Sequence, residues 1–424
     1  MVKRVCFILY IVVILAVFWG LLRGRVNIAF ALALYSTLAL LAVAFVNVLN
    51  TRGRFLKYGK ETLLAATAVI STLFLVDVIL LYVIRPANYL TYAEVNGDRF
   101  YYSNALRQKF AAINEVYRSD YVHRWYNLKW KPGSVTNFRH TEFTYRHKYN
   151  SEGLRSDEIP VKKKGNEKRV IVLGDSFVEG IGAPQDSTGP ALLQDILNAG
   201  LASDTFYTVV NAGLSGSDVF TEYYLLSNRL MAYRPDMVIV NINSTDIDDV
   251  VERGGFERFM SDSTVRIKDS PWWEPFYGGS MIVRLLARNV MGYTVNLLKF
   301  KDVPLLQQNA IDELNHAIEA FEWLAVQHNF KLVFVFQPRL NELENHQNPL
   351  GGLMRVVEKR NKALVANLYL AYGNYFREAK LPPRNYYWPI DLHHNSEGYL
   401  MWARMVKESF TYNGRYYGIN CIFE

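Results

Sequence analysis

The chain has 424 residues, 50% of them apolar, and a formal charge of +7. Its length allows about two or three domains of ordinary size. The Lys and Arg residues are scattered, with one tight cluster at residues 162–164, so we expect no nucleic-acid partner. The two cysteines, Cys6 and Cys421, exclude a disulfide framework and a cysteine-based metal site.

Three long apolar runs fill the first 85 residues, at residues 5–22, 26–49 and 62–84. Each is long enough to cross a bilayer as a helix, which takes roughly 17–25 residues. Lys3 and Arg4 would suit a signal peptide, but no small-residue cleavage site follows the first run. The sequence therefore predicts three retained transmembrane helices within residues 1–85.

Basic residues around these runs predict the orientation of the chain. The N-terminus and the segment between the second and third runs carry more Lys and Arg than the segment between the first and second. Since cytoplasmic loops are enriched in these residues, everything after residue 85 is expected outside a bacterial-type inner membrane, in the periplasm. Asp77 lies in the third run, and both a functional role and a structural pairing with Ser36 or Thr37 stay open for it.

Residues 86–160 are polar, aromatic and irregular, and end in "YRHKYNSEGLRSDEIP" at 145–160. We interpret this stretch as a connecting segment that packs on, or leads into, the next domain. Short, near-continuous apolar runs then follow, of the kind found in strands buried on both faces of a parallel sheet. These runs lie at residues 169–173, 205–210, 236–242 and 331–336.

Helical patterns alternate with the predicted strands. A segment with Pro190 in its first turn is capped by Ser187 or Thr188, and longer amphipathic segments occur later in the chain. The predicted helices cover residues 187–200, 305–329 and 354–376. Alternating strands and helices indicate a doubly wound α/β domain, interrupted by an insert or lid at about residues 247–303.

Polar residues gather where the predicted strands end, which is where open α/β sheets bind their ligands. The first strand runs into "GDSF" at 174–177, the second into "NAGLSGSD" at 211–218 and the third into "NSTD" at 243–246. Near the C-terminus, "DLHHNSEG" at 391–398 places an aspartate and two histidines ahead of a helix.

These four blocks, in this order, resemble those of the SGNH/GDSL hydrolase family over residues 168–410. The resemblance implies a flavodoxin-like, three-layer α/β/α domain with a parallel sheet, spanning residues 161–424 after the membrane helices and the connecting segment. It also implies hydrolysis of acyl esters by a serine nucleophile, which needs a base to take its proton. Ser176 would attack, His393 would be the base, and Asp391 would orient its imidazole. His394 remains an alternative base.

The resemblance further implies an oxyanion hole built from the backbone N–H groups of Ser176 and Gly216. Glycine at 216 would let the backbone approach a substrate closely. The family's third donor is an Asn side chain, but this sequence has Thr245 at that position and Asn243 where a glycine is usual. Either side chain could supply the donor. Ser215 lies in "GLSGS", which lacks the final glycine of a nucleophile elbow, and is interpreted as a turn residue.

We expect neither a cofactor nor a metal, because the histidine pair has a single carboxylate beside it and no cysteines nearby. The predicted protein is a membrane-anchored serine esterase acting on an acylated, in particular O-acetylated, cell-envelope glycan. The alternatives are an O-acyltransferase that works with a membrane partner, a lipid-acting esterase, and a non-catalytic glycan-binding protein. Loss of one oxyanion donor typically costs about 10²–10³ in turnover, so Thr245 is the residue that favours the non-catalytic alternative.

Overall fold

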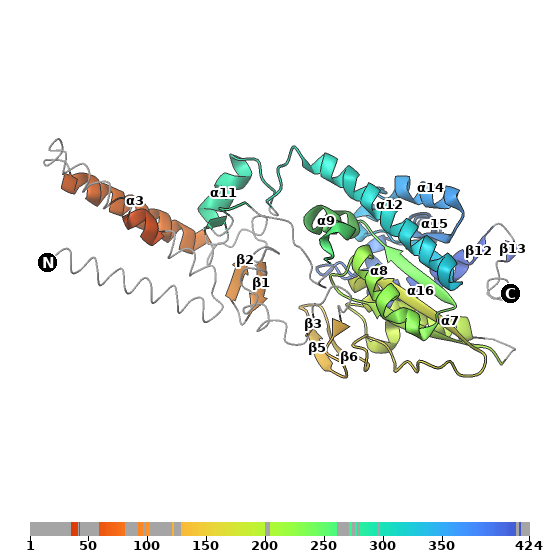
Figure 1. The fold of residues 1–424 in the computed structure, drawn as a ribbon. Coiled ribbons are helices and arrows are strands. Elements are labelled where there is room, and N and C mark those ends of the chain that lie inside the picture. The colour runs from red at the N-terminus through yellow and green to blue at the C-terminus, as the bar shows by residue number, and fades with distance from the viewer. Residues whose placement is uncertain are drawn as a thin grey trace. The chain divides into compact units, whose positions relative to one another are not determined.

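The computed structural model describes residues 35–40, 42, 59–80, 92–95, 98–101, 121–122, 129–199, 204–260, 271–273, 276–277, 280–294, 297–412 and 415–416 (Figure 1). The chain divides into two compact units. The first comprises Met1–Tyr117 and Ile267–Leu305, and the second comprises Arg118–Arg266 and Leu306–Glu424.

A parallel sheet forms the centre of the second unit. Its strands are β7 (Glu167–Gly174), β8 (Phe206–Gly213), β9 (Met237–Ile242), β10 (Lys331–Phe336) and β11 (Leu364–Asn367). They lie in the order β8-β7-β9-β10-β11, and every pair is parallel. In chain order this is 2-1-3-4-5, the flavodoxin-like order, with its switch point between β7 and β9. The predicted parallel α/β fold is confirmed.

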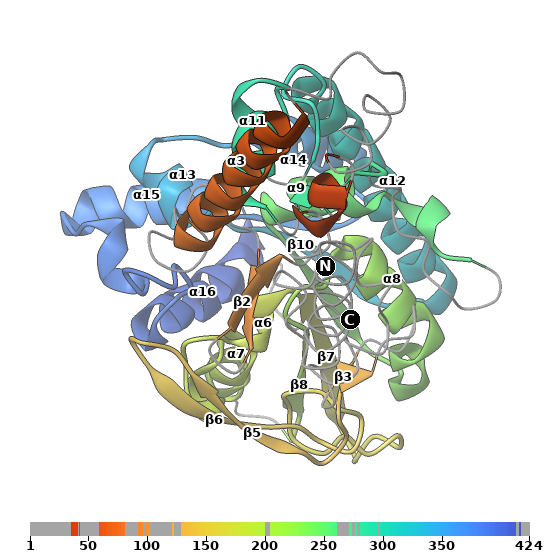
Figure 2. The same ribbon diagram turned by 90° about the vertical axis from the view of Figure 1, so that its left-hand side faces the viewer.

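Helices cover both faces of this sheet, which explains why its strands are apolar almost throughout. Figure 2 shows α7 (Gly189–Asn198) and α16 (Ser396–Ser409) on one side, with α8 (Val219–Asn228) and α12 (Val303–His328) on the other. On the α7 side, Trp402 and Leu193 join one buried cluster with Val172. On the other side, Phe321 of α12 meets Phe334 of β10 edge to face, with ring centroids 6.3 Å apart.

Shorter elements complete the described part of the second unit, and the following counts concern those residues alone. Its remaining helices are α6 (Ser176–Glu179), α9 (Thr245–Arg253), α13 (Leu340–Glu344), α14 (Gly351–Arg360) and α15 (Leu368–Ala379), with single 3₁₀ turns at Gln185–Ser187, Leu230–Tyr233, Phe256–Arg258 and Pro383–Tyr386. Three antiparallel pairs accompany them: β3 (Tyr121–Val122) with β4 (Lys129–Trp130), β5 (Val135–Arg139) with β6 (Thr144–Lys148), and β12 (Thr411–Tyr412) with β13 (Arg415–Tyr416).

The first unit contains α3 (Gly59–Ile79), α11 (Met281–Asn289) and a hairpin of β1 (Tyr92–Val95) with β2 (Asp98–Tyr101). Asp77 of α3 is buried, accepts a hydrogen bond from the Tyr35 hydroxyl and accepts another from the backbone N–H of Ile282, at 2.8 Å. Its structural partners are therefore Tyr35 and the first turn of α11. Tyr277, Ala287 and Leu297 form a small core nearby, with Trp273 packed against it.

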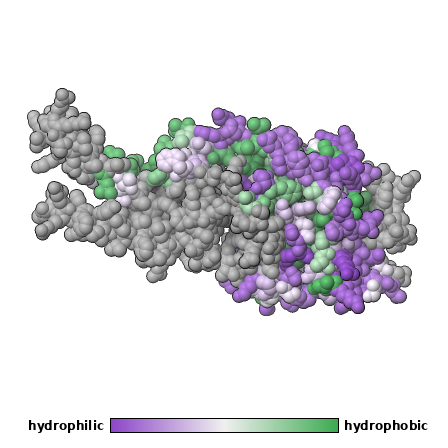
Figure 3. Space-filling view, in the orientation of Figure 1, coloured by the Kyte–Doolittle hydropathy of each residue, from purple (hydrophilic) through white to green (hydrophobic). Residues whose placement is uncertain are grey.

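No helix in the described part of the chain is both long enough and apolar enough to cross a bilayer. The prediction of three transmembrane helices is therefore not supported by these helices. Apart from residues 35–40 and 42, the predicted spans at 5–22 and 26–49 lie outside the described residues, and α3 covers most of the third. Figure 3 shows hydrophobic residues at the surface over α3 and α11, whereas hydrophilic residues cover most of the visible, described surface of the second unit.

The unit boundaries differ from the predicted ones at residues 85 and 160. The second unit begins at Arg118 because the stretch before β7 joins the α/β domain directly: Arg155 donates to the carbonyl oxygens of Glu179 and Gly180, at 3.1 and 2.6 Å. Helix α9 follows β9 at once and lies in the second unit, and the insert or lid at about residues 247–303 stays a prediction. Its later part, Ile267–Leu305, belongs to the first unit, where the bond between Ile282 and Asp77 holds it.

The predicted helix over 354–376 is wrong. Helix α14 ends at Arg360, and Asn361 takes a left-handed backbone conformation (φ 52°) that ends the helix. Residues 364–367 then pair with β10, and α15 starts at Leu368. The apolar run "ALVA" suits a strand as well as a helix, and the open edge of β10 decides between them.

Candidate active site

Ser176 stands at the carboxyl end of the central strand β7. Gly174 ends the strand, and a Cβ there would collide with Val178, so only glycine lets the chain turn this tightly into α6. Asp175 caps α6 by accepting the backbone N–H of Phe177 at 2.9 Å. Ser176 is the first residue of the helix and is partly exposed, which presents its hydroxyl at the switch point of the sheet.

The loop before α16 brings a histidine to this serine from 217 positions along the chain. His393 Nε2 lies 2.7 Å from Ser176 Oγ, and His393 Nδ1 lies 2.6 Å from Asp391 Oδ1. Leu392, between the two polar residues, has a φ of 68°, an uncommon conformation for leucine that lets residues two apart turn toward each other. Nucleophile, base and orienting carboxylate thus form one hydrogen-bonded chain.

The electrostatics of this loop favour an ionised Asp391. Burial raises the pKa of its carboxyl, but the hydrogen bonds and charge of His393 outweigh burial, so the pKa lies below its usual value. The carboxylate therefore holds the Nδ1–H tautomer of His393, which leaves Nε2 as the proton acceptor facing Ser176. Phe177 packs on the imidazole, with ring centroids 4.8 Å apart.

The structure distinguishes between the two adjacent histidines. His394 is fully buried, its Nε2 lies 3.3 Å from the Gln337 amide, and its ring contacts Tyr387 at 4.4 Å between centroids. Burial lowers the pKa of His394 to about 3, so it stays neutral at ordinary pH. His394 is thus turned into the protein, and His393 is the histidine that faces Ser176.

Gly216 has an open backbone, which a donor to the oxyanion needs. Its φ is +77°, a conformation that favours glycine, and a Cβ built on it would meet only open space. The loop around it is held by Ser217, whose hydroxyl lies 3.0 Å from the carbonyl oxygen of Gly174 and 2.9 Å from Glu222 Oε1. The backbone of Gly216 therefore stays accessible from the side where a side chain would otherwise project.

The third block places Asn243 and Thr245 side by side, but with their polar groups turned toward the protein. Asn243 Nδ2 donates to Asp175 Oδ2 at 2.9 Å, and the Thr245 hydroxyl lies 2.5 Å from Asn243 Oδ1. A hydroxyl carries one proton, and the closer acceptor takes it. As arranged here, these side chains support Asp175 and do not present the third oxyanion donor that the sequence predicts.

A group of buried carboxylates lies behind this block. Asp246 accepts the backbone N–H of Asn243 at 3.0 Å, and burial, followed by the charge of Asp175, raises its pKa well above the usual value. Burial, followed by the charge of Asp246, likewise raises the pKa of Glu222 well above its usual value. Asp218 instead pairs with Arg258 at 2.6 Å; although burial opposes ionisation, the nearby arginines lower its pKa to about 2.

Sequence reasoning missed two glutamates that hold the site. Glu142, in the turn between β5 and β6, accepts the backbone N–H groups of Ile390 and Asp391 at 3.0 and 2.8 Å. Glu179 is fully buried at the end of α6 and accepts the backbone N–H of Ser215 at 2.6 Å. The sequence did hold a signal for Glu179. It lies one helical turn after Ser176, and a glutamate at such a position is rarely buried unless it is paired. Nothing in the sequence marked Glu142.

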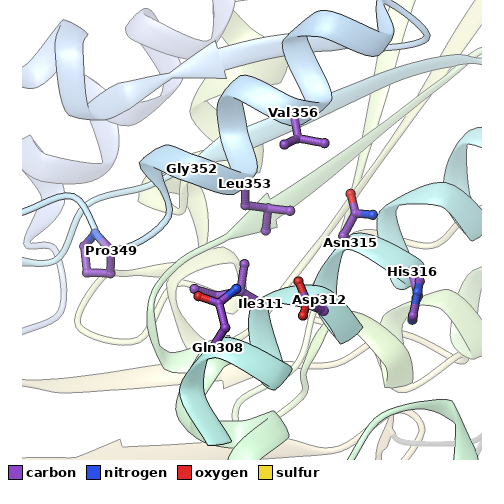
Figure 4. Close-up of a pocket in the computed structure, with 9 residues that line it drawn as sticks. All are labelled: Gln308, Ile311, Asp312, Asn315, His316, Pro349, Gly352, Leu353 and Val356. Atoms are coloured by element: carbon purple, nitrogen blue, oxygen red, sulfur yellow. The ribbon is translucent and has the colours of Figure 1, made fainter. Parts of the chain in front are cut away.

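Among the described residues no group of three or more His, Cys, Asp and Glu side chains is placed to hold a metal ion. A surface pocket of about 660 Å³ lies between α12 and α14, where Figure 4 shows Gln308, Asp312 and Asn315 facing Leu353 and Val356. None of Ser176, His393 and Asp391 lines it.

No family model matches the chain, and no curated protein matches it. Similar solved structures include LAE5, an α/β hydrolase from the metagenome of Lake Arreo, Spain, at 16% identity over 59% of this chain and 96% of that one, with a TM-score of 0.38. Axe2, an acetylxylan esterase from Geobacillus stearothermophilus, is also 16% identical over 60% and 98% of the two chains, with a TM-score of 0.38. A two-domain esterase active on acetylated mannans is 12% identical over 57% and 49%, with a TM-score of 0.36.

At these values the likeness concerns the fold alone. The chain itself shows the strand order 2-1-3-4-5, a serine directly after β7, a glycine loop after β8, and an Asp-x-His loop that meets the serine before the last long helix. This arrangement is the one that the sequence resemblance to the SGNH/GDSL hydrolases implies.

Proposed function

We propose that this protein is a serine esterase that hydrolyses acyl esters, and that its substrate is an O-acetylated glycan of the cell envelope. The observation that carries the proposal is the hydrogen-bonded chain from Ser176 through His393 to Asp391. An assembled chain of this kind supports an enzyme over a non-catalytic glycan-binding protein, because a binding site needs no base beside a serine.

The geometry supports acylation as the first step. Ser176 Oγ attacks the ester carbonyl carbon while His393 Nε2 takes its proton. The carbonyl oxygen becomes negatively charged and accepts hydrogen bonds from the backbone N–H groups of Ser176 and Gly216. His393 then gives the proton to the leaving sugar oxygen as its bond to the acyl carbon breaks, and the acyl group remains on Ser176.

Deacylation repeats these roles with water. His393 takes a proton from the water molecule, whose oxygen attacks the acyl carbon, and returns that proton to Ser176 Oγ as the acyl–serine bond breaks. Throughout both steps the Asp391 carboxylate stabilises the imidazolium that His393 becomes. Acetate and a regenerated Ser176 hydroxyl are the products.

Labelling with a fluorophosphonate probe tests the nucleophile. We expect the wild-type protein to label and Ser176→Ala not to, while Ser227→Ala, on α8 and outside the site, labels as the wild type does. Folded wild-type protein that resists labelling would contradict the esterase and favour the glycan-binding alternative.

Acetate release tests the substrate and the acceptor. We expect acetate from O-acetylated glycan, little fatty acid from phospholipid, and no change when an unacetylated acceptor sugar is added. Transfer of the acetyl group to that sugar would instead identify a transferase, whose acyl donor would have to come from a membrane partner. Faster release from phospholipid would identify a lipid-acting esterase.

Attachment to the inner membrane, with the catalytic unit in the periplasm, is the part of the proposal that rests on the sequence. Its support is the length of the three apolar runs and the exposure of apolar side chains on α3, where Val69 and Leu75 are each 58% exposed. We expect the full chain to stay with membranes after alkaline carbonate extraction. Its release into the supernatant would contradict anchoring without affecting the esterase proposal.

A further inference from the structure

Glu179 is a charged side chain that the mechanism above does not use, although it lies one helical turn after the nucleophile. It is fully buried. Its Oε2 accepts both the backbone N–H and the hydroxyl of Ser215, each at 2.6 Å, and its Oε1 accepts the hydroxyl of Tyr149 at 3.0 Å. Three donors therefore converge on one carboxylate in a site closed to water, which is the environment that a buried carboxylate requires.

The donors come from segments far apart in the sequence. Tyr149 follows β6, and the nearby Arg155 is also buried and donates to the carbonyl oxygens of Glu179 and Ala183, the second at 2.7 Å. Ser215 lies in the loop after β8. Gly213, at the end of that strand, lacks the Cβ that would collide with the backbone of Glu179, so helix and strand end lie in direct contact. Glu179 thus links the nucleophile helix to the loop that carries Gly216.

Two different side chains fix the peptide groups before and after the Ser215–Gly216 peptide, which carries the Gly216 N–H. Glu179 holds the N–H of Ser215, one residue before Gly216. Arg253 Nη1 donates to the carbonyl oxygen of Gly216 itself at 2.8 Å. Because each peptide unit is planar, anchoring the units on both sides restricts the rotation of the unit that carries the Gly216 N–H.

We propose that Glu179 is a positioning residue that aims the Gly216 N–H at the oxyanion, with Tyr149 fixing the direction of its carboxylate. This inference rests on the proposed function, in which Gly216 receives the developing charge. The preorganised direction of such donors supplies their catalytic effect, so a loop that moves by a fraction of an ångström weakens it. Ser215, interpreted from the sequence as a turn residue, is the link through which Glu179 acts.

The kinetic test compares Glu179→Gln with Glu322→Gln. Glu322, on α12, is likewise buried and accepts a hydrogen bond from Arg360, at 2.9 Å, but it lies outside the site. We expect Glu179→Gln to lower kcat for a simple acetyl ester about 10- to 100-fold with KM changed less than about 3-fold, because only transition-state binding is lost. Tyr149→Phe should lower kcat about 3-fold, and Glu322→Gln should leave it unchanged.

A thionoacetyl ester separates oxyanion binding from general loss of structure. Sulfur accepts hydrogen bonds weakly, so the thiono substrate gains little from the oxyanion donors. We expect the ratio of ester to thionoester turnover to fall about 10-fold in Glu179→Gln and to stay constant in Glu322→Gln. A lower kcat with an unchanged ratio, or an equal effect in both variants, would overturn the proposal.

Amide hydrogen exchange tests the inference even if the wild type has no esterase activity. In Glu179→Gln the amides of residues 214–217 should exchange at least about 10-fold faster than in the wild type, while those of β10 should be unaffected. Unchanged protection of residues 214–217 would overturn the positioning role. Faster exchange in a wild-type-like fold that turns over no ester would uphold the link from Glu179 to the loop and reject the esterase instead.

Discussion

The ends of β7 and β9 are adjacent in the sheet, yet their polar side chains point in different directions. After β7, Ser176 presents its hydroxyl to His393 at 2.7 Å. After β9, Asn243 and Thr245 bond each other and Asp175, at 2.5 and 2.9 Å. The end of β7 therefore carries the nucleophile. The end of β9 supports it indirectly, because Asp175 is the N-cap of the helix that begins at Ser176.

A strand end at the switch point is therefore not by itself a catalytic position. What decides is where the hydrogen-bond donors are directed. The hydroxyl of Thr245 has a nearby acceptor within the protein, whereas Ser176 has as its partner a histidine that can take a proton. Substitutions at the two ends should therefore differ greatly in effect.

The largest effect is expected at the serine end. Ser176→Ala or His393→Ala should lower kcat for an acetyl ester by about 10⁶-fold, since either removes the proton transfer that activates the nucleophile. Steady-state hydrolysis measures this, with circular dichroism to show that the fold persists. His394→Gln should retain most activity, and a loss there equal to that of His393→Ala would contradict the assignment of the base.

Asp391→Asn should lower kcat by about 10⁴-fold. An amide in place of the carboxylate donates to Nδ1, which forces the wrong tautomer on His393 and removes the charge that stabilises its imidazolium. The pH dependence of kcat/KM checks this, because the rate should recover partly at high pH, where the protonated imidazole no longer competes. A loss below about tenfold would mean that Asp391 does not orient the base.

Glu142→Gln should lower kcat about 5- to 20-fold. The carboxylate accepts the N–H groups of Ile390 and Asp391, and a displaced loop would lengthen the bond from Asp391 to His393. Glu344→Gln is the matched control, because Glu344 forms an exposed ion pair with Arg384. Equal activity in both variants would show that the loop at residues 390–391 keeps its position without Glu142.

The smallest kinetic effect is expected at the end of β9. Thr245→Val should change kcat less than about 3-fold, because the hydroxyl already bonds Asn243. Thr245→Asn should leave the rate unchanged or raise it, by adding a side-chain donor near the oxyanion. A 100-fold loss in Thr245→Val would show that the hydroxyl turns toward the substrate during the reaction and would remove the contrast between the two strand ends.

A stability test concerns the segment that joins the α/β domain. Burial, followed by the charge of Arg155, lowers the pKa of His147 to about 3 from the usual 6.5. Below pH 6.5 His147 is protonated in the unfolded chain but stays neutral in the folded chain. The folded state therefore loses stability as the pH falls toward 3. By linkage the loss between pH 7 and pH 5 is about 2 kcal/mol. His147→Phe should abolish this pH-dependent loss of stability, because phenylalanine does not titrate. The stacking of residue 147 on Phe138, with ring centroids 5.3 Å apart in the wild type, should be kept.

Urea unfolding of both proteins at pH 7 and pH 5 measures the difference. Taking the difference between variants matters because an acid with a raised pKa titrates in the opposite sense: the pKa of the half-buried Asp249 is raised to about 8, mainly by desolvation, so its contribution grows as the pH falls. A stability difference that does not change with pH would mean that His147 is accessible to protons in the folded protein.

Much of the α/β domain could be predicted from local signals. The strands β7, β9 and β10 and the helices α7 and α12 match their predicted ranges within a few residues, because a continuous apolar run marks a buried strand and a helical period marks an amphipathic helix. The edge strand β11 could not be recognised, since four apolar residues between two helices have no period of their own. The predicted membrane spans fall mainly on residues that the structure does not describe.

The sequence by itself determined the residue types of the site and their order: a serine after a strand, a glycine loop, and an Asp-x-His block near the C-terminus. Long-range packing settles which histidine faces Ser176, that Thr245 and Asn243 bond inward, and that Glu142 and Glu179 hold the two loops. Residue type is encoded locally, whereas the direction of a donor depends on acceptors supplied by segments up to 249 positions away in the chain.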